Sequence, residues 1–379
     1  MCRMGNRVKI YRMKVNVLCL GLREYKSRSL LLPLIRFRQK LRQSGIYIEI
    51  FTSDSERLSN CDAIIIEDRY YISGKKRRPE LSKKQINRIK QLRDEVDQLL
   101  WFDTQDGTKI QLPMVIPYVD KYCKKDILKD KNLYKKPLHD FRLFSDYYQS
   151  NFDRCHGTDE ERIVQATSKV DLSKLAQYWN LGYNIHTPAP DLFWKLLNNL
   201  PYTLSGKFPW KKIMDWTRLW TPVDADRPVD ISGRFSTTYA LDGVEFHRKL
   251  MEKRLQHRFD SEAVNSLAYW RELQQSKVLL SPFGYGEVCL RDFEGFMSGC
   301  VVVKPNMDHI ETWPPVYEAN KTMVSVPWNM SDIEEQVDQI LENYAEYKQI
   351  AETGQKRYKK YLTGDSAPEL FIDQFKSLM

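Results

Sequence analysis

The stretch that decides the fold runs from residue 276 to residue 305 and reads SKVLLSPFGYGEVCLRDFEGFMSGCVVVKP. It begins with an apolar run at 277–280 that predicts a buried strand, and it ends with a second such run at 300–303. Between them lie a glycine-containing loop and a segment at 290–297 with helical character, which Gly299 is expected to end. A strand, a loop, a helix and a second strand in this order predict one unit of a parallel α/β sheet.

The same alternation is predicted at the start of the chain. A strand, a helix and two further strands are expected, in that order, at residues 14–20, 30–43, 46–51 and 62–67. Ser82 is the expected N-cap of a long helix. The pattern weakens after about residue 120 and resumes at residue 229. Because 379 residues exceed the usual size of a single core, we predict two α/β domains.

Composition narrows the class of protein. The net charge of +9 indicates anionic partners, such as phosphorylated ligands or peripheral contact with a membrane, although a charge run such as 75–78 is more often a solvated face. The seven cysteines lack metal-ligand or disulfide spacing, which favours a reducing, cytoplasmic setting. No apolar run has the length of a membrane span, and no signal peptide is expected. Aromatic residues do not alternate with the basic clusters, so nucleic acid is not an expected partner.

The loop and helix of the opening stretch have the chemistry of an anion site. The N–H groups and dipole at a helix N-terminus attract anions, most often phosphate, and Gly284 and Gly286 let the backbone approach a ligand closely. Arg291 suits a diphosphate, while Glu287 and Glu294 suit the hydroxyls of a sugar or ribose. The spacing of Glu287 and Arg291 is equally that of a surface ion pair.

Two aspartates of the first domain lie where a parallel sheet collects ligands. Asp103 follows a strand predicted at 100–102, and Asp106 comes shortly after it. An ordinary Asp-Gly turn explains these residues equally well. In the second domain, Arg234 follows the strand predicted at 229–232, where it is either a ligand contact or a solvated loop residue, and Lys304 is a weaker candidate.

Residues 276–305 resemble the nucleotide-sugar-binding segment of GT-B glycosyltransferases, in particular the exostosin-like and group 1 families. The features that match, in order, are Ser281-Pro282, Gly284, Gly286, Arg291, Glu294, Gly299-Cys300-Val301 and Val303. The close match covers this stretch, and the two-domain layout extends it more loosely. The resemblance implies an α/β fold of two Rossmann-like domains that face a cleft, a nucleotide-sugar donor, and a glycan or other hydroxyl acceptor, as in polysaccharide biosynthesis.

The resemblance also implies roles for individual residues. Glu294 matches the carboxylate that contacts the ribose of the donor, and Arg291 a contact to the diphosphate or sugar. Glu287 takes the place of the glutamate that contacts the transferred sugar in retaining members, although the residues after it differ from the usual small ones. An inverting enzyme would need a general base, for which Asp103 or Asp106 is the candidate. The predicted donor site comprises Arg234, Gly284, Tyr285, Gly286, Glu287, Arg291 and Glu294.

No metal or other cofactor is expected, because fixed cations can stabilise a leaving diphosphate. Asp224-Ala225-Asp226 has the spacing of a metal motif but lies in a proline-flanked linker. The predicted domains are 1–195, with an irregular segment at about 120–195, a linker at 196–227, a nucleotide-sugar domain at 228–362, and a helix at 363–379 that packs back on the first domain. A non-catalytic glycan- or nucleotide-binding module of the same fold is the alternative. A Rossmann dehydrogenase is disfavoured because residues 20–23 carry a single glycine.

Overall fold

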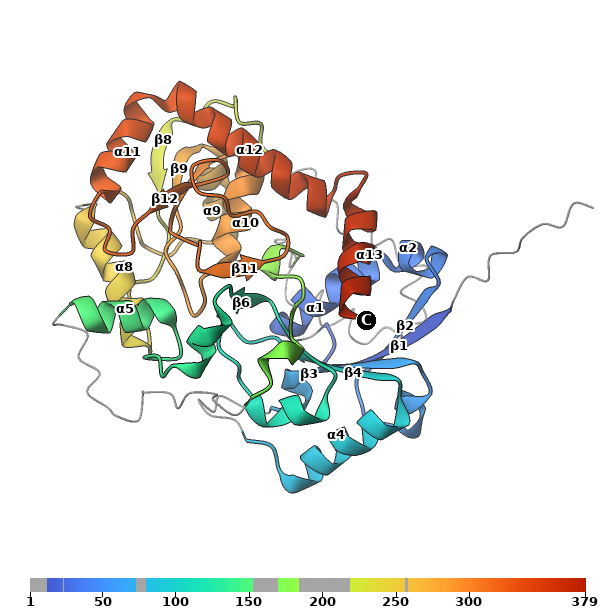
Figure 1. Ribbon diagram of the computed structural model, residues 1–379. Helices are drawn as coiled ribbons and strands as arrows, with labels where there is room; N and C mark the ends of the chain where they lie inside the picture. Colours follow the sequence, from blue (N-terminus) through green and yellow to red (C-terminus); the bar gives the residue numbers. More distant parts are fainter. Residues whose placement is uncertain (1–11, 23, 73–79, 153–169, 184–218, 256–257) are drawn as a thin grey trace, which may run out of the picture.

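The computed structural model describes residues 12–22, 24–72, 80–152, 170–183, 219–255 and 258–379. Its larger sheets are two separate parallel sheets, one in each half of the chain (Figure 1). The predicted α/β fold of two Rossmann-like domains is therefore confirmed. None of the helices in these ranges combines the length and the apolar character that a membrane span requires.

The first sheet has six parallel strands in the order β2-β1-β3-β4-β5-β7. Every residue of β3 is buried, which is typical of a central strand that is covered on both faces. In chain order the strands are β1 Met13–Leu18, β2 Ile46–Phe51, β3 Ala63–Glu67, β4 Gln98–Asp103, β5 Lys121–Lys124 and β7 Leu175–Gln177. The helices of this half are α1 Tyr25–Arg36, α2 Arg38–Gln43, α3 Asp68–Tyr71, α4 Lys83–Glu95 and α5 Leu143–Asn151.

Two helix predictions in this half have different outcomes. Ser82 caps α4 as expected, because Ser82 N donates to Gln85 Oε1 at 2.8 Å and Gln85 N donates to Ser82 Oγ at 3.3 Å. The single helix predicted at 30–43 is wrong: α1 begins at Tyr25, and the chain breaks at Phe37 before α2. The turn at Phe37 buries its ring against that of Phe371, 5.1 Å away, at the other end of the sequence.

The second sheet has four parallel strands in the order β12-β10-β9-β8. They are β8 Val229–Ser232, β9 Ser276–Leu280, β10 Val301–Pro305 and β12 Val324–Val326. The surrounding helices are α8 Asp242–Arg254, α9 Ser266–Gln274, α10 Leu290–Ser298, α11 Ile333–Glu342 and α12 Tyr344–Leu362. Gly299 ends α10 with a left-handed φ of 70°, as predicted. The strand, loop, helix and strand of the opening stretch are thus β9, the 281–289 loop, α10 and β10.

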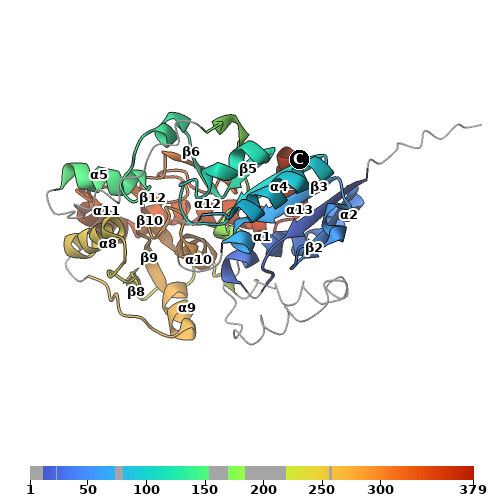
Figure 2. The same cartoon turned by 90° about the horizontal axis from the view of Figure 1, so that it is seen from below.

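The two halves are joined at several places besides the linker. Strand β6 (Asp126–Leu128) pairs antiparallel with β11 (Ile310–Thr312), so a short sheet spans both halves. Helix α5 leaves the first half and packs against α8 of the second (Figures 1 and 2). The final helix, α13 (Ala367–Leu378), packs against α2 of the first. The exact domain boundaries remain a prediction.

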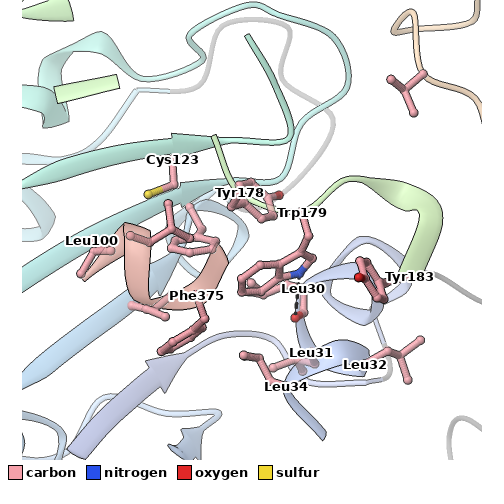
Figure 3. Packing of buried hydrophobic residues seen from close by; sticks show 14 of the residues in the cluster. Leu30, Leu31, Leu32, Leu34, Leu100, Cys123, Tyr178, Trp179, Tyr183 and Phe375 are labelled. Atoms are coloured by element: carbon pink, nitrogen blue, oxygen red, sulfur yellow. Dashed lines mark hydrogen bonds between the residues drawn. The ribbon is translucent and has the colours of Figure 1, made fainter. Parts of the chain in front are cut away.

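Trp179 holds the end of the chain against the first domain (Figure 3). Its indole Nε1 donates to Ser29 O at 3.0 Å and lies 3.2 Å from Leu30 O, and both acceptors belong to α1. Its ring centroid is 4.9 Å from that of Phe371 on α13. The indole is fully buried, so it fills the space between α1 and α13 and makes the last helix part of the first domain's core.

Candidate functional site

A pocket of about 470 Å³ is lined by residues of both halves of the chain. The first half contributes Lys26 and Asp106, and the second contributes the loop before α10 and the first turn of that helix. Of the predicted site residues, the pocket brings together Asp106, Arg234, Gly284, Tyr285, Gly286, Arg291 and Glu294. Asp103 and Glu287 do not line it.

A buried histidine holds the glycine loop in place. Phe283 N donates to His247 Nε2 at 3.0 Å, so the proton of the ring is on Nδ1, which is bonded to Tyr148 Oη. The Tyr148 hydroxyl in turn donates to Trp328 O at 2.6 Å. Burial lowers the pKa of His247 well below its ordinary value, and the nearby charge of Arg248 lowers it further. The imidazole is therefore neutral, and it links the loop to α5 of the first half.

Asp292 fixes the start of α10 from inside. Its carboxylate accepts from Cys289 N at 2.9 Å, from Tyr317 Oη at 2.7 Å and from Lys304 Nζ at 3.0 Å. The side chains of Asp292 and Lys304 are completely buried. Lys304 therefore does not reach the pocket edge, and its role as a ligand candidate is wrong. The pair instead orients the helix whose N-terminus opens into the pocket.

Arg248 and Arg291 are two of the cations that line the pocket. Arg248 donates from Nε to Phe283 O at 2.7 Å and lies 4.4 Å from the ring centroid of Tyr239. Arg291 donates to Arg234 O at 3.2 Å. Within the described residues no carboxylate forms an ion pair with Arg248 or Arg291. From its position in the middle of a predicted helix, Arg248 was expected to be a structural or surface group rather than a ligand contact.

Arg234 lines the pocket, but carboxylates already compensate its charge. Its Nε donates to Glu272 Oε2 at 2.8 Å, and its Nη1 lies 2.6 Å from Asp260 Oδ2. These bonds raise the pKa of Arg234, and the hydrogen bond to Glu272 has the largest effect. The predicted role as a diphosphate contact is therefore not supported by this geometry. Its carbonyl oxygen orients Arg291 instead.

Glu294 is the carboxylate that the second domain presents to the pocket. It is almost completely buried, with 8% of its surface exposed, and it lies one turn after Arg291 on α10. Tyr269, on α9, donates to Glu294 Oε2 at 2.7 Å. The pocket thus places a carboxylate beside cations, which suits a ligand with both hydroxyl and phosphate groups.

Asp106 forms the first-domain wall together with two lysines. Its carboxylate lies 2.9 Å from Lys26 Nζ and 3.1 Å from Lys125 Nζ. Burial acts to raise the pKa of Asp106, but Lys125 and Lys26 outweigh it and hold the pKa well below its ordinary value. A carboxylate with a low pKa and two ammonium partners is a weak base. The candidate role of Asp106 as general base therefore requires that one lysine be displaced.

Asp103 is buried and paired, so the geometry does not support its candidate role as a base. It is fully buried, accepts from Tyr122 Oη at 2.7 Å and lies 3.2 Å from Lys124 Nζ. Its oxygens also accept from the backbone N–H groups of Gln105 and Gln111, at 3.0 Å each. The carboxylate thereby shapes the loop that presents Asp106, and it has no access to a substrate.

Glu287 lies behind the pocket rather than in it. It is fully buried, and its Oε1 is 3.3 Å from His309 Nε2. Burial acts to raise the pKa of Glu287, but the bond and charge of His309 keep it below its ordinary value. Among the described residues, Glu287 Oε2 has no hydrogen-bond partner. In this arrangement Glu287 is enclosed by protein, and its contact with a transferred sugar stays a prediction.

The loop that contains Gly286 and the first-domain loop that contains Gly107 are in contact next to the buried Glu287. A Cβ atom on Gly286 would lie 2.9 Å from Gly107 Cα and 3.3 Å from Asp106 C, and one on Gly107 would lie 3.6 Å from Glu287 Oε2. Arg142 Nε donates to Tyr285 O at 2.7 Å across the same boundary. Only a residue without a side chain fits at 286, so the glycine loop closes the pocket against the first domain.

A metal site does not form among the described residues, since no three His, Cys, Asp or Glu side chains gather there. Asp224 of the Asp-x-Asp spacing is exposed and lies 3.6 Å from Lys348 Nζ.

Comparison with known proteins gives similarity at the level of structure alone. No protein-family model matches the chain, and no curated protein matches its sequence. Solved structures that are similar over 97% of the chain include Anabaena HepE with UDP and glucose, at 10% identity, 100% coverage of that chain and a TM-score of 0.44. A glycosyltransferase from Rickettsia africae gives 10%, 98% and 0.47. A Listeria monocytogenes protein described as a putative UDP-N-acetylglucosamine 2-epimerase gives 11%, 96% and 0.41. The narrower exostosin-like resemblance remains a prediction.

Proposed function

We propose that the protein is a glycosyltransferase that moves a sugar from a nucleotide-sugar donor to the hydroxyl of a glycan or another acceptor. One observation carries the proposal: the pocket between the domains combines a helix N-terminus, two arginines without carboxylate partners among the described residues, and the carboxylate of Glu294. A nucleoside diphosphate has the complementary groups, with two phosphates for the cations and ribose hydroxyls for the carboxylate.

The donor site would act by electrostatic stabilisation. As the bond from the sugar to the diphosphate breaks, negative charge grows on the leaving oxygen, and Arg291, Arg248 and the N-terminus of α10 lie ready to stabilise it. These groups are held by protein contacts before the ligand arrives: Arg248 by Phe283 O and Arg291 by Arg234 O. Fixed positive charge of this kind makes a metal unnecessary, which is part of the proposal.

The first-domain wall would face the acceptor. Lys26 and Asp106 are the charged groups there, and the low pKa of Asp106 limits it as a base. For Asp106 to act as the base of an inverting reaction, its carboxylate would have to lose its bond to one lysine and accept a hydrogen bond from the acceptor hydroxyl. A retaining reaction needs no such base. Peripheral contact with a membrane and a cytoplasmic setting also remain predictions.

Thermal unfolding with nucleotides tests the proposal. A ligand that binds only the folded state raises the melting temperature, so UDP, GDP, CMP and dTDP are each added at millimolar concentration, both without and with excess EDTA. We expect one nucleoside diphosphate to raise the melting temperature of the wild type, and Glu294→Ala and Arg291→Ala to lose most of that shift. The nucleotide that binds then selects the nucleotide sugars for a turnover assay that detects the released diphosphate.

Three other outcomes are possible, and each contradicts one part of the proposal. No shift with any nucleotide would remove its main support. A shift that disappears with EDTA would contradict metal independence. Binding without turnover of any matching nucleotide sugar, in the presence of glycan acceptors, would favour a non-catalytic binding module.

A further inference from the structure

Tyr269 is a pocket residue to which the proposed function gives no role. It lies on α9, which packs against α10, and its hydroxyl donates to Glu294 Oε2 at 2.7 Å. Both side chains line the pocket. The bond therefore ties two helices of the second domain together at the point where a nucleotide is proposed to bind.

Arg291 is a residue of the same helix with which Glu294 could form an ion pair. Arg291 lies three residues earlier, and opposite charges at this spacing on a helix can pair. In the part of the chain that the structure describes, no ion pair joins them. Arg291 is directed instead to Arg234 O at 3.2 Å and lies 5.6 Å from the ring centroid of Phe235. A pair between Arg291 and Glu294 would neutralise the two charges on which recognition of a nucleotide depends.

We propose that Tyr269 is a positioning residue that holds the Glu294 carboxylate away from Arg291 and toward the ribose, and so sets a preference for a ribonucleotide over its 2′-deoxy form. This inference rests on the proposed function. A carboxylate can accept about four hydrogen bonds, so a bond from Tyr269 is compatible with a second one from a ribose hydroxyl. A site built to bind a hydroxyl rejects an analogue that lacks it, because a buried polar group then stays unpaired.

The surroundings keep the phenol proton on Tyr269. Burial raises the pKa of Tyr269 well above its ordinary value, and the charge of Glu294 raises it further. The hydroxyl therefore remains a donor across the neutral pH range. Consequently the preference for ribose should not change between pH 6 and pH 9 through Tyr269.

The experiment compares binding of ribonucleoside and 2′-deoxyribonucleoside diphosphates by calorimetric titration. UDP, GDP, ADP and CDP and their 2′-deoxy forms are titrated into the wild type, Tyr269→Phe, Glu294→Ala and the double variant. The matched control is Tyr347→Phe, which removes a tyrosine hydroxyl on α12, outside the pocket lining. Melting temperatures of all variants are measured first, so that a loss of binding is not confused with a loss of folding.

The wild type should prefer the ribose form of its nucleotide by roughly tenfold, the effect of one hydrogen bond to a charged group. Tyr269→Phe should bring this ratio close to one, and the double variant should bind no more weakly than Glu294→Ala. Tyr347→Phe should keep the wild-type ratio.

The two failures are distinguishable. If neither these nucleotides nor dTDP binds the wild type, the proposed function fails and the inference falls with it. If dTDP alone binds, the ribose preference alone is overturned. If one binds and Tyr269→Phe keeps the wild-type ratio, the positioning role alone is overturned. The same conclusion follows if the effects of Tyr269→Phe and Glu294→Ala simply add, because residues that act through one contact do not give additive losses.

Discussion

Replacing Gly286 by alanine should force apart the two loops that close the pocket. The added Cβ would lie 2.9 Å from Gly107 Cα and 3.3 Å from Asp106 C, while carbon atoms in ordinary contact lie about 3.5–4.0 Å apart. The opposing atoms belong to the backbone of the other domain, so they cannot rotate aside as a side chain can. The loops must therefore separate by roughly 1 Å, the difference between these distances.

The loss of folding free energy from this separation can be estimated. Overpacking by one methyl group typically costs about 1–3 kcal/mol. Since 1 kcal/mol lowers the melting temperature of a domain of 150–250 residues by about 2–4 °C, Gly286→Ala should melt roughly 2–12 °C below the wild type. The variant should also bind nucleoside diphosphate more weakly, because the loop that it displaces leads into α10.

Gly284→Ala is the matched control for the melting temperature. It adds the same methyl group in the same loop, but the nearest atoms are Arg248 Nη2 at 3.4 Å and Cys289 Sγ at 3.6 Å, and neither glycine has a positive φ. Differential scanning calorimetry should therefore place Gly284→Ala close to the wild type. Equal melting temperatures for the two variants would refute the close approach of the loops at Gly286.

Other predictions follow from the charged groups. Arg291→Ala should weaken binding of a nucleoside diphosphate by roughly tenfold or more at an unchanged melting temperature. Arg234→Ala should lower the melting temperature and leave binding nearly unchanged. Calorimetric titration and thermal unfolding of both variants check this, and reversed effects would contradict it. Lys304→Met leaves Asp292 buried without its cation, so urea unfolding should show a loss of about 3–5 kcal/mol, and an unchanged free energy of unfolding would argue against a buried pair. Burial raises the pKa of Asp126 to about 7, so between about pH 4 and 7 this carboxyl holds a proton in the folded state that it has lost in the unfolded state. The contribution of Asp126 to stability therefore falls as the pH rises, by at most about 1.4 kcal/mol per pH unit. Burial also raises the pKa of Glu67 to about 7, so Asp126→Asn should reduce the slope rather than abolish it. Equal slopes in the two proteins would contradict the assignment.

The sequence predicted those parts of the fold that depend on local signals. Apolar runs at β9 and β10, the helix between them and the glycine that ends it were all expected, because each leaves its mark within a few residues. The short strands β5 and β7 were not assigned, since strands of three or four residues carry little periodicity. The break between α1 and α2 places the ring of Phe37 against that of Phe371, a contact with a residue far away in the sequence.

The candidate site shows the same division. Gly284, Gly286, Arg291 and Glu294 line the pocket, and their roles in binding a donor stay predictions. The pairing of charged residues, by contrast, is decided by tertiary contacts: Asp103 meets Lys124 on the neighbouring strand, and Arg234 meets Glu272 on α9. A single sequence does not tell a charge that is already paired from one that awaits a ligand.

Arg248 and Lys304 illustrate this most clearly. Arg248 is in the middle of a helix, a position typical of a structural or surface group, yet it lines the pocket. Lys304 ends a strand of the same sheet and was a ligand candidate, yet its amine is bonded to Asp292 inside the core. Their roles follow from the direction of each side chain relative to the core, which composition and spacing leave open.

A crystal structure with the nucleoside diphosphate that raises the melting temperature would test the central claim most directly. The account predicts that the diphosphate lies at the N-terminus of α10, within hydrogen-bond distance of Arg291 or Arg248, and that a ribose hydroxyl contacts Glu294. A nucleotide bound elsewhere, for example in the basic groove lined by Lys356, Arg357 and Lys360, with the pocket between the domains left unoccupied, would contradict it.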